Sequence, residues 1–175
     1  NYLNIANVQY QMRKYKDAIE NYNLFLSTYS QHTDARKSLA NSYLADGNYE
    51  NAAAEYEKLY MKNMKTFDNF SNYGMALFKI KNYEKAAEIL ERAIETNPES
   101  TIDHVRLALT YQELEKNDLA LPQFEVVFEQ NPKLQWLRFD YGNLLADMGK
   151  NTEALEQYNI YTASFPNDGR VYQNL

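Results

Sequence analysis

The chain of 175 residues contains no cysteine, two histidines, five glycines and four prolines. The lack of cysteine excludes disulfide bonds and thiolate chemistry, although it does not choose a cellular compartment. So few glycines and prolines argue against long linkers and disordered segments. No run of 18 or more apolar residues occurs, so no segment is predicted to cross a membrane. These absences together predict a soluble, folded chain.

The motifs of common catalytic sites are also missing. The sequence has no G-x-S-x-G, no P-loop and no glycine-rich phosphate loop. His32 and His104 are too far apart to suggest a metal pair, so neither a metal site nor a cofactor is predicted. The glutamates between positions 84 and 95 follow helical spacing beside basic residues, which is typical of a solvated helix face. We therefore predict that the chain is not an enzyme.

What the sequence does contain is a repeat of 34 residues. Alanine recurs at this interval at Ala18, Ala52, Ala86, Ala120 and Ala154. Three further columns keep the same spacing: Ala6, Ala40, Gly74, Ala108 and Gly142; Ile5, Leu39, Tyr73, Leu107 and Tyr141; and Tyr22, Tyr56, Leu90, Phe124 and Tyr158. Small residues in two facing columns predict helices whose backbones approach closely, with the larger residues packed around the contact.

A period of 34 with two helical patterns per unit is the signature of the tetratricopeptide repeat, and the chain resembles this family along its whole length. The resemblance implies an all-α fold, a right-handed solenoid of antiparallel helix pairs. A single array over 1–175 divides into repeat 1 (1–32, with a truncated start), repeat 2 (33–66), repeat 3 (67–100), repeat 4 (101–134), repeat 5 (135–168) and the start of a sixth or capping helix (169–175). The sequence opens at Asn1, inside a helical pattern, so we expect a fragment of a longer protein, of unknown localisation.

The expected helices cover 2–12, 16–28, 35–45, 50–62, 68–80, 83–96, 136–148 and 152–164, with two more in repeat 4. Thr33 or Asp34 is predicted to cap the helix that follows, and Gly47 suits a helix end that needs positive φ. Pro122 would normally break a helix. It is predicted to lie in the first turn, where a missing N–H costs nothing, so the helix is expected to be intact.

Charge is distributed unevenly along the chain, whose net charge is −6. Acidic and basic residues nearly balance over the first two repeats, and acidic residues dominate the last three. A phosphate backbone would be repelled by the acidic half, so nucleic acid is not a predicted partner.

The resemblance implies that the first helices of the repeats line a concave groove where partners bind. The candidate groove residues are Asn7, Lys37, Asn41, Asn72, Phe78, Arg106, Gln112, Trp136, Phe139, Asp140 and Asn143. Carboxamides both donate and accept, so spaced asparagines suit an extended peptide main chain. Trp136 and Phe139 are interpreted as an exposed aromatic anchor. The alternative is that a sixth helix covers Trp136.

A narrower hypothesis concerns four of these residues, Lys37, Asn41, Asn72 and Arg106. By resemblance they occupy four of the five places that form a carboxylate clamp in chaperone-binding members of the family, which hold an acidic C-terminal tail. Converging cations and carboxamides could bind a terminal carboxylate. The fifth place holds Ile102 instead of a cation, which puts the clamp in doubt.

The main hypothesis is therefore a non-catalytic protein–protein interaction scaffold that binds a peptide or a partner's helix. Three alternatives stay open: the recognition arm of a larger enzyme such as a repeat-fused glycosyltransferase or phosphatase, a carboxylate-clamp co-chaperone module, and a scaffold that self-associates end to end. The identity of the partner and the oligomeric state are not indicated by the sequence.

Overall fold

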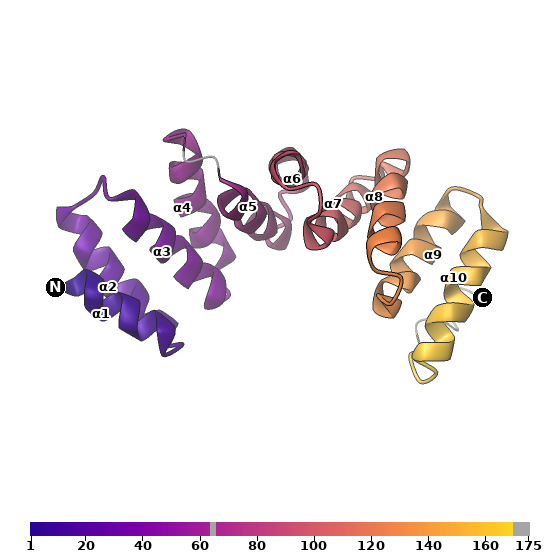
Figure 1. Cartoon of the computed structure of the whole chain (residues 1–175), viewed down its shortest axis with the longest axis horizontal. Helices are drawn as coiled ribbons and strands as arrows, with labels where there is room; N and C mark the ends of the chain where they lie inside the picture. The colour runs from indigo at the N-terminus through magenta and orange to yellow at the C-terminus, as the bar shows by residue number, and fades with distance from the viewer. Residues whose placement is uncertain (64–65, 170–175) are drawn as a thin grey trace. The chain divides into compact units, whose positions relative to one another are not determined.

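The computed structural model describes residues 1–63 and 66–169, and within these it contains ten α-helices, one 3-10 helix and no strand (Figure 1). The helices are α1 (Tyr2–Gln11), α2 (Tyr15–Thr28), α3 (Thr33–Ala45), α4 (Tyr49–Met61), α5 (Phe67–Lys79), α6 (Tyr83–Thr96), α7 (Thr101–Glu113), α8 (Asn117–Gln130), the 3-10 helix η1 (Gln135–Leu137), α9 (Arg138–Asp147) and α10 (Asn151–Ser164). The predicted all-α class is confirmed.

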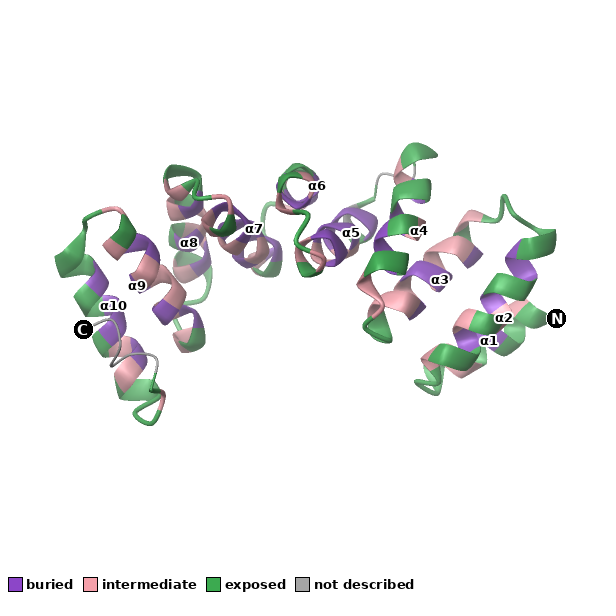
Figure 2. Cartoon of the chain, turned by 180° about the vertical axis from the view of Figure 1, so that it is seen from behind, coloured by how far each residue is buried: buried purple, intermediate pink, exposed green. Residues whose placement is uncertain are grey.

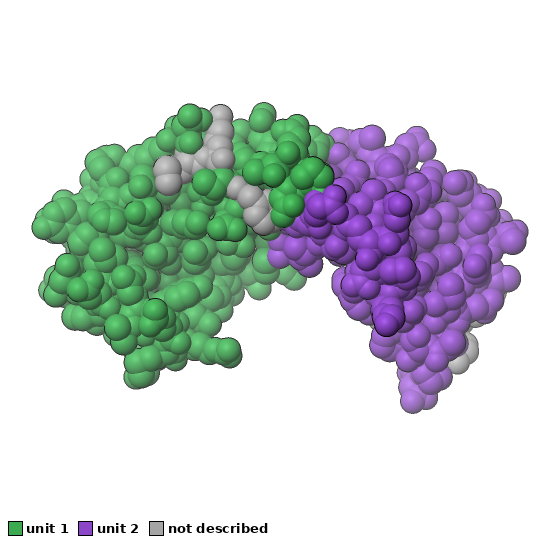
Figure 3. Space-filling model, viewed as in Figure 1, with its two compact units in different colours: residues 1–98 green, residues 99–175 purple. Residues whose placement is uncertain are grey.

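The chain divides into two compact units, unit 1 (Asn1–Pro98) and unit 2 (Glu99–Leu175) (Figure 3). In unit 1, the pairs α1–α2, α3–α4 and α5–α6 each pack together, and α2 packs on α3 and α4 on α5. In unit 2 the corresponding pairs are α7–α8 and α9–α10, joined by contacts between α8 and α9. Each unit is therefore a stretch of helical-repeat solenoid in which every pair contacts its neighbours in sequence.

Small residues lie where the two helices of a pair meet. Ala18 and Ala52 are fully buried, and in Figure 2 buried residues form bands along the helices, opposite exposed ones. A Cβ atom added at Gly142 would lie 2.5 Å from Cε1 of Tyr158, a distance at which one group must move. The recurring Ala and Gly columns therefore set how closely paired helices approach.

The turn inside each repeat contains one residue with positive φ. These residues are Arg13, Gly47, Lys81, Glu115 and Gly149, again at intervals of 34, with φ between 56° and 79°. Glycine adopts this left-handed conformation without strain, whereas a side chain with a Cβ makes it unfavourable. Gly47 was predicted from its residue type, but the three non-glycine turns were not.

Two predicted helix features need correction. The N-cap of α3 is His32, one residue before the predicted Thr33 or Asp34: its Nδ1 accepts from the backbone N–H of Ala35 at 3.1 Å. Pro122 does lie within an intact α8, but in its second turn, because the N–H of Ala120 already bonds to the carbonyl of Lys116. The helix therefore tolerates the loss of one backbone hydrogen bond, the one that Pro122 cannot donate, at an exposed position.

The other expected helices agree with the structure to within two residues at either end, with one local difference. The first helix of repeat 5 was expected as continuous from 136, whereas η1 precedes α9, which begins at Arg138. The predicted start of a sixth or capping helix, 169–175, lies outside the described residues from residue 170 on. The repeat boundaries and the single array stay predictions.

Candidate partner-binding surface

Three of the four asparagines predicted to face a peptide are bonded to tyrosines of their own repeat. In unit 1 the hydroxyl of Tyr22 on α2 donates to Oδ1 of Asn7 on α1 at 2.7 Å. The hydroxyl of Tyr56 on α4 likewise donates to Asn41 on α3. In unit 2 the hydroxyl of Tyr158 donates to Oδ1 of Asn143 at 2.8 Å. The carbonyl oxygen of each of these three asparagines is therefore already hydrogen-bonded to the other helix of its pair.

This bond was not predicted, although the sequence contains its signal. In the register of Asn7 the chain has Asn7, Asn41, Met75, Leu109 and Asn143, and in the register of Tyr22 it has Tyr22, Tyr56, Leu90, Phe124 and Tyr158. Asparagine occurs only in the repeats that have tyrosine, and an apolar residue stands opposite leucine or phenylalanine. A buried hydroxyl needs an acceptor and a buried ring or alkyl group does not, which accounts for the alternation.

Burial moves the titration of these tyrosine hydroxyls further above neutral pH. Tyr22 and Tyr56 are almost fully buried, and loss of water around the hydroxyl raises the pKa of both side chains, that of Tyr56 strongly. Desolvation raises the pKa of Tyr158 as well. The hydroxyls therefore remain donors at neutral pH, and the asparagine carbonyl oxygens remain occupied as acceptors.

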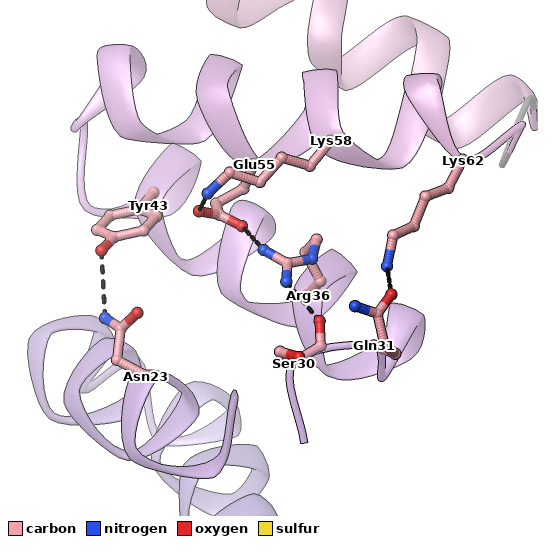
Figure 4. Close-up of polar contacts among 8 residues, drawn as sticks. All are labelled: Asn23, Ser30, Gln31, Arg36, Tyr43, Glu55, Lys58 and Lys62. Atoms are coloured by element: carbon pink, nitrogen blue, oxygen red, sulfur yellow. Dashed lines mark hydrogen bonds and ion pairs between the residues drawn. The ribbon is translucent and has the colours of Figure 1, made fainter. Parts of the chain in front are cut away.

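A second kind of polar contact, at another position of the repeat, also joins the two helices of a pair (Figure 4). The guanidinium of Arg36 on α3 pairs with the carboxylate of Glu55 on α4, and its Nη2 donates to the carbonyl of Ser30 at 2.7 Å. In unit 2, Arg138 donates to Gln157 at 2.6 Å in the same register. These side chains hold helices and a loop together and are not oriented for a partner.

The four residues of the clamp hypothesis have partners of their own. Nζ of Lys37 lies 3.5 Å from Asp68, and Nδ2 of Asn72 donates to Oδ1 of Asn41 at 3.2 Å. In unit 2, Nη1 of Arg106 lies 2.9 Å from Oδ1 of Asp103. A terminal carboxylate at either cation would have to compete with a carboxylate of the chain. The first three residues belong to unit 1 and Arg106 to unit 2, so the clamp stays a hypothesis.

The aromatic candidates differ in exposure. Phe139 is only 8% exposed and packs against Tyr158 and Tyr161, with ring centroids 5.8 and 5.5 Å apart. The expectation of an exposed aromatic pair is therefore wrong for Phe139, because the tyrosines of α10 bury its ring. Trp136 is 48% exposed. Phe78 is half-buried in unit 1 and contacts Tyr83 edge to face.

One surface of unit 2 combines an exposed aromatic ring with polar side chains. This surface, the α9 face, consists of Trp136, Asp140, Asn143 and Asp147. Spacings of four, three and four residues place them along one side of η1 and α9. Nε2 of Gln112 on α7 donates to the carbonyl of Asp140 at 3.0 Å, so α7 flanks this face. A hollow of about 470 Å³ opens at its end, lined by Asn143, Ala146, Asp147 and Tyr158.

Other kinds of site find no support in the described part of the chain. Among residues 1–63 and 66–169, no group of three or more His, Cys, Asp or Glu side chains could hold a metal ion. Over the same residues, no helix is long and apolar enough to cross a bilayer.

Comparison with known proteins agrees with this architecture. The family model of the tetratricopeptide repeat matches residues 3–65, and the model of anaphase-promoting complex, cyclosome, subunit 3 matches residues 45–127. Tetratricopeptide repeat protein 12 of Homo sapiens is 29% identical over 153 residues, which is 76% of this chain and 21% of that protein. The chain thus spans about a fifth of the length of this curated relative.

Two solved structures are similar over nearly the whole chain. YrrB, described as a TPR protein with an unusual peptide-binding site, has a TM-score of 0.88 at 25% identity and covers 99% of this chain and 89% of its own. MamA from Desulfovibrio magneticus RS-1, from residue 41 to its end, has a TM-score of 0.84 at 16% identity over 96% of both chains. Helix pairs repeated every 34 residues define a helical-repeat solenoid. Residues 3–65 match the tetratricopeptide-repeat family model, and the fold of the described residues is that of tetratricopeptide-repeat proteins.

Proposed function

We propose that the chain is a non-catalytic protein–protein interaction scaffold and that it binds an extended peptide or a partner's helix on the exposed face of its first helices. Two findings support the general role: the tetratricopeptide-repeat fold implies protein partners, and the similar protein YrrB has a peptide-binding site. The observation that carries the proposal is the α9 face, which combines an exposed tryptophan with a polar hollow.

The chemistry of the α9 face favours one kind of ligand. Trp136 offers a large, rigid apolar surface at one end, and amphipathic aromatic residues of this kind are common binding hot spots. Asp140 and Asp147 place two carboxylates further along the same side, within the acidic part of the chain. A segment with an apolar side chain followed by lysine or arginine would satisfy both features, and complementary charge would speed its association.

Trp136 also provides the measurement, because it is the single tryptophan of the chain. Peptides selected from a display library against the 175-residue protein can be titrated while its fluorescence is followed. Affinities of the variants are measured by isothermal titration calorimetry, because Trp136→Ala removes the fluorophore. We expect Trp136→Ala to weaken the selected peptides by about 2 kcal/mol, which is roughly thirtyfold in Kd, and to leave the melting temperature within a few degrees. Met61→Ala, on α4 of unit 1 and 78% exposed, is the matched control and should leave affinity unchanged.

Two outcomes would contradict the proposal. If Trp136→Ala lowers the melting temperature sharply while affinity stays the same, the tryptophan is part of the core. If selected peptides bind equally well to the variants Asp140→Asn and Asp147→Asn, the carboxylates take no part. The same peptides with free and with amidated C-termini test the clamp hypothesis, because loss of the terminal carboxylate weakens binding only where a clamp exists.

A further inference from the structure

The start of α3 in unit 1 is held by a residue that can change its charge. His32 is the N-cap, and its carbonyl accepts from the N–H of Arg36 at 3.1 Å while its ring nitrogen Nδ1 accepts from the N–H of Ala35 at 3.1 Å. The ring meets Phe25 of α2 edge to face, with centroids 5.2 Å apart. A ring nitrogen that accepts an N–H carries no proton of its own, so this cap requires the neutral ring with its proton on Nε2.

Protonation of the ring removes the acceptor and adds a repulsion. A protonated histidine carries an N–H on both ring nitrogens, so Nδ1 and the N–H of Ala35 become two donors that face each other. Ala35 is 1% exposed, and a buried N–H that loses its acceptor costs stability. The new positive charge also lies at the N-terminal end of the α3 dipole, which disfavours cations. Histidine gains its proton in the mildly acidic range, so the cap is present at neutral pH and is lost as pH falls.

The charges around this loop do not favour a second cation at the cap. Nη2 of Arg36 donates to the carbonyl of Ser30, and Nζ of Lys62 on α4 donates to Oε1 of Gln31, so two cations already contact the loop (Figure 4). The end of α2 adds no charge at neutral pH, because residues 21–28 read NYNLFLST. Cations outnumber carboxylates among the titratable and charged groups of the loop, of the start of α3 and of the adjoining part of α4, which are Tyr29, Asp34, Arg36, Glu55, Lys58 and Lys62.

The other repeats show that a first helix of this array folds without such a cap. The N-caps at the same position before α5 and α7 are Thr66 and Ser100, and neither side chain makes a capping bond. The hydroxyls of threonine and serine also do not titrate near neutral pH. Loss of the histidine cap therefore loosens the start of α3 and does not unfold the unit.

We infer that His32 makes the start of α3 a pH-sensitive element of the fold: the neutral ring closes the first turn, and proton uptake in mild acid releases it. Arg36 keeps its ion pair with Glu55 on α4, so the release is confined to the loop and the first turn. Lys37, a candidate groove residue, follows directly in α3. The inference does not depend on the proposed function.

Three variants of the 175-residue chain test the inference. His32→Asn keeps a side-chain acceptor that does not titrate, and His32→Ala removes the acceptor at every pH. His104→Gln removes the only other histidine of the chain and leaves His32 in place. Exchange of the backbone amide hydrogens is followed by nuclear magnetic resonance near neutral pH and at about pH 5. Each rate is compared with that of an unfolded peptide at the same pH, which gives the protection of the amide.

We expect the protection of the Ala35 amide to fall about fivefold on acidification in the unchanged chain and in His104→Gln, because a helix cap contributes about this factor. It should stay constant in His32→Asn and be low at both pH values in His32→Ala. The inference is overturned if the unchanged chain and His32→Asn respond equally to acid, or if His104→Gln loses the response. It is also overturned if His32→Ala is as protected as the unchanged chain at neutral pH, or if the nitrogen-15 shifts of the neutral ring show a proton on Nδ1.

Discussion

The tyrosine–asparagine bond between paired helices can be tested at the level of single residues in repeat 5. Asn143→Leu removes the acceptor at 2.8 Å from the Tyr158 hydroxyl, which lies on a 5% exposed residue. We expect a loss of about 1–3 kcal/mol in the free energy of unfolding, because a buried donor is left without this partner. The double variant Asn143→Leu/Tyr158→Phe reproduces the pair Leu109 and Phe124 of repeat 4 and should recover most of the loss.

Urea denaturation of the two single variants and the double variant gives the coupling energy of the pair. The interpretation predicts strong non-additivity. Additive losses would show that the bond contributes nothing and that the pattern along the sequence has another origin.

The buried tyrosines also predict how stability depends on pH. Desolvation raises the pKa of Tyr56 and Tyr73 well above the usual value of 10. A group with a raised pKa in the folded state contributes stability that is fully present below its unfolded pKa and is lost as pH rises. We therefore expect stability to fall above pH ~10, by up to about 1.4 kcal/mol per pH unit for each tyrosine.

Melting temperatures measured between neutral pH and strongly alkaline pH, in the unchanged chain and in Tyr56→Phe, would check this expectation. The variant lacks one titrating group, so its stability should decline less steeply above pH ~10. Parallel curves for the two proteins would contradict the assignment of the alkaline loss to Tyr56.

At the level of helices and turns, the residues with positive φ can be tested by substitution to glycine and by substitution from glycine. Lys81→Gly should stabilise the chain by up to about 1 kcal/mol, because it removes a Cβ from a residue at φ 62°. Gly47→Ala should destabilise it by about the same amount. A Cβ at Gly47 would meet no atom within 4 Å, so backbone conformation alone causes the loss. Chemical denaturation of both variants is the measurement, and a Gly47→Ala variant as stable as the unchanged chain would contradict it.

The helices could be predicted from the sequence because their spacing repeats, so that weak local signals add up over five repeats. The turns illustrate the limit. Glu115 has a side chain that normally avoids positive φ, but it lies in the turn that ends α7, where the N–H of Lys116 donates to the carbonyl of Tyr111 at 2.8 Å. The cap at His32 was missed for a similar reason, since histidine is not among the usual capping residues.

For the candidate site, side-chain direction was the limiting factor. The period assigns a residue to a helix face, but it does not show whether a neighbouring ring covers it. Phe139 was placed correctly on its helix, yet Tyr158 and Tyr161 reach it from α10. The asparagines could have been assigned correctly by comparing each one with the tyrosine fifteen residues later in the same repeat. Without that comparison they were predicted to bind a ligand, whereas the tyrosine hydroxyl is the donor that they bind in the structure.

At the level of the whole molecule, the helix pairs within each unit contact their neighbours in sequence, so stability should be distributed along the chain. Unit 1 contains its own buried cluster around Tyr56, Leu59 and Ile89. We expect a polypeptide of residues 1–98 to fold by itself and to melt cooperatively. Circular dichroism and amide dispersion would establish this. A fragment that is helical but melts without cooperativity would show that unit 1 requires the remainder of the chain.

The alternation of polar and apolar pairs has a consequence for how the chain avoids misassembly. Five helix pairs of nearly the same size could exchange partners during folding, which is a common failure of repeat proteins. If α3 paired with α6 instead of α4, Asn41 would face Leu90 and Arg36 would face Ile89, and two polar groups would be buried without partners. The correct neighbour provides Tyr56 and Glu55. The polar pairs thus disfavour exchange between a repeat that has the tyrosine–asparagine pair and a repeat that has an apolar pair at the same positions.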